Sequence, residues 1–218
     1  PGDKGYNEVK NYVKEKFDAF YNAIKSSSAN LADYADVDSV TKIYLINELG
    51  KNWDSGVSSL YFTYKQDENG DWKFFGSPVW DYDNSLGNAK GVEWDLGNIG
   101  VNDYEQYSGW WCKYKDKGKN SNSTNNVMNL ISRNKNVIKA APQVWFEDFV
   151  PALKTFMSSG VSEGEIYSSD VYYNYLKGSA EMNYKSGWLL NTGSWIADHS
   201  KLNVATFDYS TGKYTVSN

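Results

Sequence analysis

The chain has little of the chemistry that many catalytic and metal sites need. Its 218 residues include one cysteine, Cys112, and one histidine, His199. A single cysteine forms no internal disulfide, and a zinc site of the Cys/His type needs several such ligands. A catalytic triad that depends on histidine would have to rest on His199 alone. These shortages exclude a disulfide scaffold and a Cys/His zinc centre, and they argue against a histidine-based mechanism.

Long apolar runs and an excess of basic residues are also lacking. No apolar run approaches the roughly 20 residues that a bilayer-spanning helix needs, and no basic segment followed by an apolar one opens the chain. The net charge is −5, whereas a protein that binds nucleic acid needs a basic surface for the phosphates. We therefore expect no membrane span and no nucleic-acid partner.

Aromatic residues, in contrast, are abundant, at 17% of the chain with 9 Trp and 18 Tyr. Hydrophobic residues make up 40% and charged residues 22%, a globular composition that predicts one domain over residues 1–218. Tryptophan and tyrosine fill cores and also stack on sugar rings. Trp110 and Trp111 are adjacent in the loop-like stretch SGWWCKY, which favours either an exposed platform for a sugar or protein, or burial against a helix.

Helical patterns lie on both sides of a central segment. Apolar residues at steps of three and four predict a first helix over residues 6–24. A second helix is expected in DVDSVTKIYLINELG, with Asp38 as its N-cap and Gly50 at its end. Helices are expected again after residue 126, first in NVMNLISRN, then in APQVWFEDFVPALKTFMSSG, which has Pro142 near its start, and last in SSDVYYNYLKGSAEMNYKSGWLL. Helices therefore dominate the predicted fold.

The central segment predicts a β-hairpin. Two β-rich runs, expected near 57–65 and 72–80, flank DENGD, in which Asn69 and Gly70 form a strong turn signal. DENGD has alternating acidic and amide residues like a calcium loop, but it lacks the glycine and glutamate that such a loop requires, so we favour a hairpin. A second small hairpin is expected in the tail, VATFDYSTGKYTVS. The fold class is therefore α+β.

Two aspartates flank the central hairpin. Asp54 precedes the first strand in KNWDSG, and Asp81 follows the second in VWDYD, with Asp83 one residue beyond. Because a hairpin returns both its ends to one edge, we expect Asp54 and Asp81 to lie close together around a cation. In phosphoryl transfer, one aspartate orients the attacking hydroxyl and another holds magnesium. Ser59, five positions after Asp54, is a further candidate metal ligand.

The segment that holds these residues closely resembles the CotH (spore coat protein H) kinase family. The resemblance is dense over residues 37–88, in INEL-KN-D, S-YFTYK, FGSPVWDYD and LGN, and it is looser through 126–157. It implies an atypical protein kinase fold that is secreted or displayed on a cell or spore surface. It also implies ATP and Mg²⁺ or Mn²⁺ as cofactors.

The resemblance also implies roles for single residues. Asp54 matches the catalytic-loop aspartate, and Asp81 matches the metal-binding aspartate of the DFG-like element. Asp83 is the natural second carboxylate, and Ser59 stands where related sequences often have asparagine. No GxGxxG loop occurs in the chain, and no strand with an obvious candidate lysine precedes the first expected helix. We therefore expect a mainly helical, kinase-like C-lobe with a central hairpin, and no N-lobe within the chain.

Two functions of different classes remain open from the sequence. The first is transfer of the γ-phosphoryl group of ATP to a Ser or Thr hydroxyl of an extracellular or surface protein. The second is a non-catalytic binding or structural module in an extracellular, cell-wall-degrading assembly of the cellulosome type, with Trp110 or Trp111 contacting polysaccharide. A glycosidase that uses Asp54 and Asp81 as its acid and base ranks last.

Overall fold

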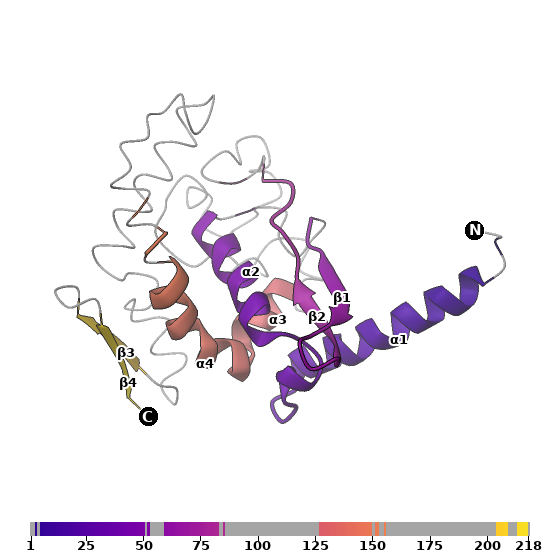
Figure 1. The fold of residues 1–218 in the computed structure, drawn as a ribbon, viewed down its shortest axis with the longest axis horizontal. Coiled ribbons are helices and arrows are strands. Elements are labelled where there is room, and N and C mark those ends of the chain that lie inside the picture. The colour runs from indigo at the N-terminus through magenta and orange to yellow at the C-terminus, as the bar shows by residue number, and fades with distance from the viewer. Residues whose placement is uncertain are drawn as a thin grey trace, which may run out of the picture.

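The structure is a computed structural model of the 218-residue chain. It describes residues 5–50, 59–82 and 127–149 continuously, the single residues Asp3, Asn52, Ser85 and Thr155, the pair 151–152, and the backbone of 204–208 and 213–217. The fold is α+β and mainly helical, as predicted. Its helices pack around a two-stranded antiparallel sheet, and a second two-stranded sheet lies near the C-terminus (Figure 1).

Helix α1 (Tyr6–Lys25) confirms the first predicted helix. The C-terminal half of its apolar stripe is buried, and Phe20 and Ile24 belong to the core. The N-terminal half projects away from the rest of the molecule (Figure 1), which leaves Val9 and Val13 exposed. One amphipathic stripe therefore has two environments, a distinction that the residue pattern alone does not make.

Helix α2 (Val37–Gly50) follows a short 3₁₀ turn, η1 (Leu31–Asp33). The expectation that Asp38 caps α2 is wrong, because the carboxylate of Asp36 accepts the backbone N–H of Ser39 at 2.7 Å. An N-cap must precede the first helical residue, and Asp38 already lies inside the first turn. There its carboxylate forms an i,i+4 ion pair with Lys42 at 2.7 Å.

Strands β1 (Phe62–Gln66) and β2 (Trp72–Gly76) form the central hairpin, with Phe62 opposite Gly76 and Gln66 opposite Trp72. Both strands are shorter than predicted at the open end of the hairpin. Asp67 organises the connecting loop, since its carboxylate accepts the N–H groups of Asn69 and Asp71 at 2.9 and 3.0 Å. The same carboxylate pairs with Lys73 at 2.8 Å, so DENGD is a hairpin loop, as favoured from the sequence.

The hairpin is attached to the start of α2 by backbone hydrogen bonds. Phe74 donates its N–H to the carbonyl oxygen of Tyr34 at 2.9 Å and accepts the N–H of Asp36 at 2.8 Å. The N–H of Gly76 donates to the hydroxyl of Ser39 at 3.1 Å. A Cβ atom at Gly76 would overlap the carbonyl oxygen of Ser39 and lie 3.0 Å from Cγ2 of Ile43. Only glycine permits this close approach of strand to helix.

Helices α3 (Val127–Arg133) and α4 (Lys135–Val144) complete the helical layer, and the π-helix η6 (Trp145–Phe149) follows α4 directly. The first of the helices expected after residue 126 is confirmed. The start of the second is wrong, because α4 begins at Lys135 and Pro142 lies inside it, and the third, expected over residues 168–190, lies outside the described residues. The cap at Asn134 sets this start: its side chain accepts the N–H of Asn136 at 2.9 Å.

Asn134 also joins the ends of two helices that are far apart in the sequence. Its side-chain amide donates to the carbonyl oxygen of Ile24, in the last turn of α1, at 3.0 Å. One buried amide therefore caps the N-terminus of α4 and satisfies the C-terminus of α1. The core beside it is aromatic: Phe20 stacks on Phe74 with ring centroids 4.7 Å apart and meets Phe62 edge-on at 5.1 Å.

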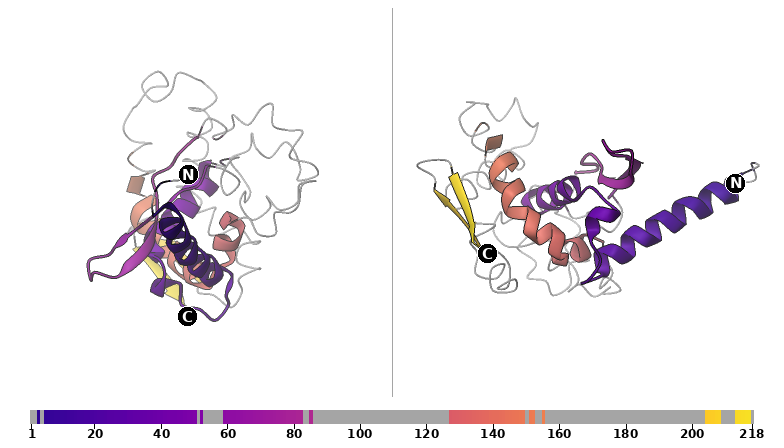
Figure 2. Two further views of the ribbon diagram at one scale, coloured as in Figure 1. Left: turned by 90° about the vertical axis from the view of Figure 1, so that its right-hand side faces the viewer. Right: turned by 60° about the horizontal axis from the view of Figure 1, so that its bottom comes forward.

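The tail hairpin consists of β3 (Val204–Asp208) and β4 (Lys213–Ser217) with antiparallel pairing, as predicted. Figures 1 and 2 place it at one end of the longest axis of the molecule, with the N-terminus of α1 at the other end. Among the described helices, none has the length and apolar character needed to cross a membrane.

Candidate functional site

The open end of the central hairpin holds the residues on which the functional prediction rests. Pairing of the chain continues beyond the two strands. The N–H of Ser77 donates to the carbonyl oxygen of Tyr61 at 3.2 Å, and the hydroxyls of Thr63 and Ser77 lie 2.9 Å apart. These bonds bring the segment before β1 alongside the segment after β2, so residues 22 positions apart become neighbours.

Ser59 and Asp81 meet at this end. The hydroxyl of Ser59 donates to Oδ2 of Asp81 at 2.7 Å. Ser59 is half-buried and Asp81 is exposed. The backbone φ of Asp81 is +59°, in the left-handed region, which costs a residue with a side chain about 1–2 kcal/mol. Strained backbone of this kind clusters at functional sites, and here it fixes the direction in which the carboxylate points.

Two exposed aromatic rings stand beside this pair. Tyr61 is 56% exposed and Trp80 is 63% exposed, and their rings form an edge-to-face contact with centroids 6.2 Å apart. Sequence reasoning placed the exposed aromatic platform elsewhere and did not find these rings. The alternation of side chains along a strand could have indicated the exposure of Tyr61. Phe62 packs against the core, so its neighbour Tyr61 must face the other way.

A groove lies on the other side of the segment that leads to Asp81. Its volume is about 780 Å³. One wall is α2, the second is the chain just after β2, and the third is η6 with the start of the next helical turn. Its lining residues are Ser39, Lys42, Ile43, Ile46, Leu49, Gly76, Ser77, Pro78, Val79, Asp148, Phe149 and Ala152.

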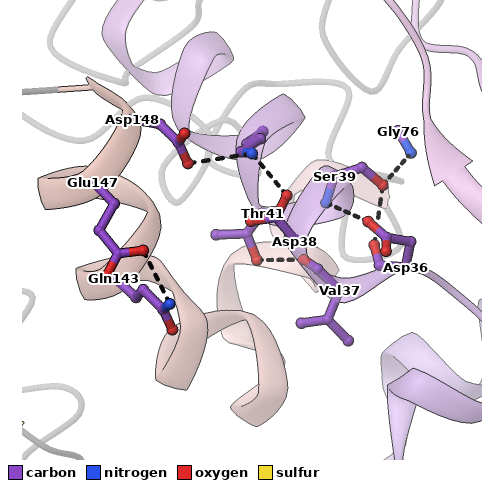
Figure 3. A network of polar contacts seen from close by, with 10 residues as sticks. Asp36, Val37, Asp38, Ser39, Thr41, Gly76, Gln143, Glu147 and Asp148 are labelled. Carbon is purple, nitrogen blue, oxygen red and sulfur yellow. Dashed lines mark hydrogen bonds and ion pairs between the residues drawn. The ribbon is translucent and has the colours of Figure 1, made fainter. Parts of the chain in front are cut away.

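Charge in the groove is concentrated between α2 and η6. The ammonium group of Lys42 contacts the carboxylates of Asp38 at 2.7 Å and Asp148 at 3.2 Å, and Figure 3 shows both acids turned toward the space between the two helices. The hydrogen bond that Lys42 donates to Asp38 raises the pKa of Lys42 above its usual value, and its bond to Asp148 adds to this rise. Lys42 is therefore charged at neutral pH. Because two carboxylates surround one ammonium group, the cluster has one negative charge in excess.

Comparison with known proteins identifies the family. The CotH kinase protein family matches residues 2–138, which is more than half of the chain. The chain belongs to the CotH kinase family. No curated protein and no solved structure matched it. The family match contains Ser59, Asp81 and the whole central hairpin, whereas Asp148 and Phe149 of the groove lie beyond its end.

The structure describes only two of the six candidate site residues predicted from the sequence. Ser59 and Asp81 lie in direct contact. The four other candidates, Asp54, Asp83, Trp110 and Trp111, lie outside the residues that the structure describes. The closeness of Asp54 to Asp81 therefore stays a prediction. The contact across the open end of the hairpin shows that the turn does return distant residues to one edge, as the topological reasoning requires.

The Ser59–Asp81 pair fits the divalent cation that a CotH kinase implies. Magnesium prefers oxygen ligands, keeps several waters, and uses one or two carboxylates together with substrate phosphates. The pair presents a hydroxyl and an exposed carboxylate at one point. In the described part of the chain, no group of three or more His, Cys, Asp or Glu residues comes together.

Proposed function

We propose that this CotH family member transfers the γ-phosphoryl group of ATP to a Ser or Thr hydroxyl of an extracellular or surface-displayed protein, with Mg²⁺ or Mn²⁺ as cofactor. One observation carries the proposal beyond family membership: the contact at 2.7 Å between Ser59 and the exposed, conformationally strained Asp81 at the open end of the hairpin. The family resemblance also supports a location outside the cell or on its surface.

Each acidic residue has a separate task in this proposal. Asp54 orients the acceptor hydroxyl and takes its proton as the hydroxyl oxygen bonds to the γ-phosphorus and the bond from that phosphorus to ADP breaks. Asp81 binds the divalent cation, together with Ser59 and Asp83. Bound there, the cation would neutralise the charge that develops on the nucleotide phosphates. The hydrogen bond from the Ser59 hydroxyl holds the carboxylate of Asp81 in place before ligands arrive, so less ordering is needed on binding.

The order of elements supports a kinase-like C-lobe. A buried helix, α2, leads to the segment of Asp54, the hairpin β1–β2 follows, and the DFG-like element comes next. Protein kinases place a catalytic-loop aspartate and a metal-binding aspartate on their C-lobe. On this basis we propose that residues 1–218 form one domain whose hairpin presents both aspartates to the nucleotide.

Calorimetric titration of Mg-ATP into the 218-residue chain tests the metal site. We expect Asp81→Asn to weaken binding at least about tenfold, the scale of losing one ligand-supporting group. Asp71→Asn is the matched control, since it changes an aspartate at the opposite end of the same hairpin. Because related sequences often carry asparagine where Ser59 stands, Ser59→Asn should keep or strengthen binding, whereas Ser59→Ala should weaken it. Equal affinities for Asp81→Asn and the wild type would refute the proposed site.

The exposed pair Tyr61 and Trp80 favours a second candidate, a non-catalytic module that binds polysaccharide in an extracellular assembly. Aromatic rings that present a face to solvent stack on sugar rings. Titration with a soluble cello-oligosaccharide distinguishes the two functions. Sugar binding that is lost in Trp80→Ala, or in variants of Trp110 or Trp111, together with no heat from Mg-ATP, would support the module and not the kinase.

A further inference from the structure

The groove between α2, the chain after β2 and η6 has the size and lining of a binding site. Ligand pockets in proteins commonly have volumes of about 300–1,000 Å³ and mostly apolar walls with few polar groups, and this one has about 780 Å³. Ile43, Ile46 and Phe149 are among its apolar lining residues. Burying an apolar side chain of a partner against such walls is favourable because it removes apolar surface from water.

The third wall of the groove is an unusual structure. The five residues Trp145–Phe149 form a π-helix directly after α4, and single π-turns are often found at functional sites. The wider turn carries both Asp148 and Phe149, which line the groove. Trp145 in the same turn is fully buried and stacks on Phe149 with centroids 5.4 Å apart. This stacking anchors the wall in the core.

The charges of the groove specify the partner. Lys42 and Asp148 line the groove, and Lys42 also contacts Asp38, which is not a lining residue, so this cluster of three charged groups has one negative charge in excess. The two acids are 56% and 47% exposed at their side chains, and each therefore has oxygen atoms open to a further donor. A partner that buries an apolar group here and carries a neighbouring cation would match both the apolar walls and the negative charge of the cluster around Lys42.

The groove is close to the proposed phosphotransfer site. Val79 lines the groove and is 49% exposed, and only Trp80 separates it from Asp81. Two residues of extended chain span at most about 7 Å. An acceptor polypeptide with its hydroxyl at the site would therefore reach the groove with a side chain a few residues away. A polypeptide fits this geometry because one backbone carries the acceptor hydroxyl and the apolar side chain at a fixed spacing.

We propose that this groove binds the acceptor protein of the kinase through one large apolar side chain that is flanked by Lys or Arg and lies two to four residues from the phosphorylated Ser or Thr. The inference rests on the proposed function, because it assigns the groove to the acceptor of that reaction. The apolar side chain fills the space between Ile46, Phe149 and Val79. The flanking cation pairs with Asp148, which lines the groove and whose carboxylate contacts Lys42 at 3.2 Å.

The probe is a fluorescein-labelled nonapeptide of glycine and alanine with one serine, a leucine three positions after it, and a lysine next to the leucine. Two further peptides replace the leucine by glycine or the lysine by glutamine. Fluorescence anisotropy with the 218-residue chain, without nucleotide, should show the tightest binding for the first peptide. Loss of the leucine should weaken binding about tenfold or more, from the apolar area that is no longer buried.

Two pairs of variants test where the peptide binds. Ala152→Phe fills the groove from an exposed position that lines it and should weaken binding about tenfold. Ala32→Phe makes the same change at an exposed residue of η1, outside the groove, and should leave binding unchanged. Asp148→Asn should remove the preference for lysine over glutamine, whereas Asp18→Asn, on the exposed face of α1 and paired with Lys14, should retain it.

The outcomes separate this inference from the proposed function. Binding that depends on the leucine and is blocked by Ala152→Phe supports the groove, even if no phosphate is transferred when Mg-ATP is added, in which case the kinase proposal fails alone. Phosphate transfer that is equal for the peptides with and without leucine overturns the docking inference and leaves the kinase intact. No binding of any peptide, or equal binding to Ala152→Phe and the wild type, also overturns the inference.

Discussion

Replacement of Gly76 by alanine tests how the hairpin and α2 are held together. A Cβ atom at this position would overlap the carbonyl oxygen of Ser39 and come within 3.0 Å of Cγ2 of Ile43. The carbonyl belongs to the backbone of a helix and cannot rotate away. The strand must therefore move off the helix, which also breaks the 3.1 Å bond from the Gly76 N–H to the Ser39 hydroxyl.

The expected destabilisation from Gly76→Ala is about 2 kcal/mol. Overpacking costs about 1–3 kcal/mol, and the lost hydrogen bond adds about 1 kcal/mol. The lower backbone entropy of alanine in the unfolded chain offsets about 0.7 kcal/mol of this. Urea unfolding followed by tryptophan fluorescence measures the change as a lower midpoint with an unchanged slope. Because Gly76 adjoins the chain that leads to Asp81, weaker Mg-ATP binding is expected as well.

Two control variants separate the causes. Ser39→Ala removes the hydrogen bond with Gly76, and the one that the Ser39 hydroxyl donates to the carbonyl oxygen of Asp36 at 3.1 Å, without the overlap, and should cost about 1–2 kcal/mol. Gly70→Ala has open space around the new Cβ atom but a φ of +85°, so its cost of about 1 kcal/mol is purely conformational. If the free energy of unfolding of Gly76→Ala lies within about 0.5 kcal/mol of the wild-type value, β2 does not approach α2 as closely as described.

Three further predictions concern the scaffold. Asn134→Ala should cost about 2–3 kcal/mol in urea unfolding, because it removes a cap and leaves the carbonyl of Ile24 unpaired. Asn134→Asp keeps the cap but places a buried carboxylate oxygen against that carbonyl, so it should cost at least as much. The hydrogen bond from Lys73 lowers the pKa of Asp67 in the folded state. The ionised carboxylate therefore stabilises the fold fully above the unfolded pKa of about 4, and this stabilisation is lost as the pH falls further. The free energy of unfolding, measured from pH 7 to pH 2.5, should decline less in Asp67→Asn than in the wild type. Phe20→Ala should cost about 3–5 kcal/mol, whereas Val9→Ala, on the projecting half of α1, should change stability by less than about 0.5 kcal/mol.

Local patterns predicted the elements that rest on local physics. The stripe of α1 and the Asn69-Gly70 turn both depend on residues within a few positions of one another, so the chain itself contained the signal. The cap of α2 was missed by two residues, because Asp36 and Asp38 are both good capping residues and only the backbone path decides between them. The start of α4 was missed because Pro142 was given the role that proline has in a first turn, whereas Asn134 supplied the actual cap.

The candidate site could be predicted only as far as the hairpin topology extends. That topology correctly brought the segments before β1 and after β2 together, and Ser59 now contacts Asp81. The positive φ of Asp81 and the exposure of Tyr61 and Trp80 were not predicted, since they depend on how the chain leaves the sheet. Asp148 near Lys42 was out of reach, because no pattern relates residues so far apart in the chain.

The sequence by itself determined the family, the alternation of helix and hairpin, and the oxygen-rich residues that a nucleotide-bound cation would need, because spacing and residue chemistry carry that information. The tertiary structure alone decided which of these residues meet, which half of α1 is covered, and that a groove opens beside Asp81. Those features arise from contacts between distant segments, such as Gly76 on Ser39 and Asn134 on Ile24, and such contacts form only when the chain has folded.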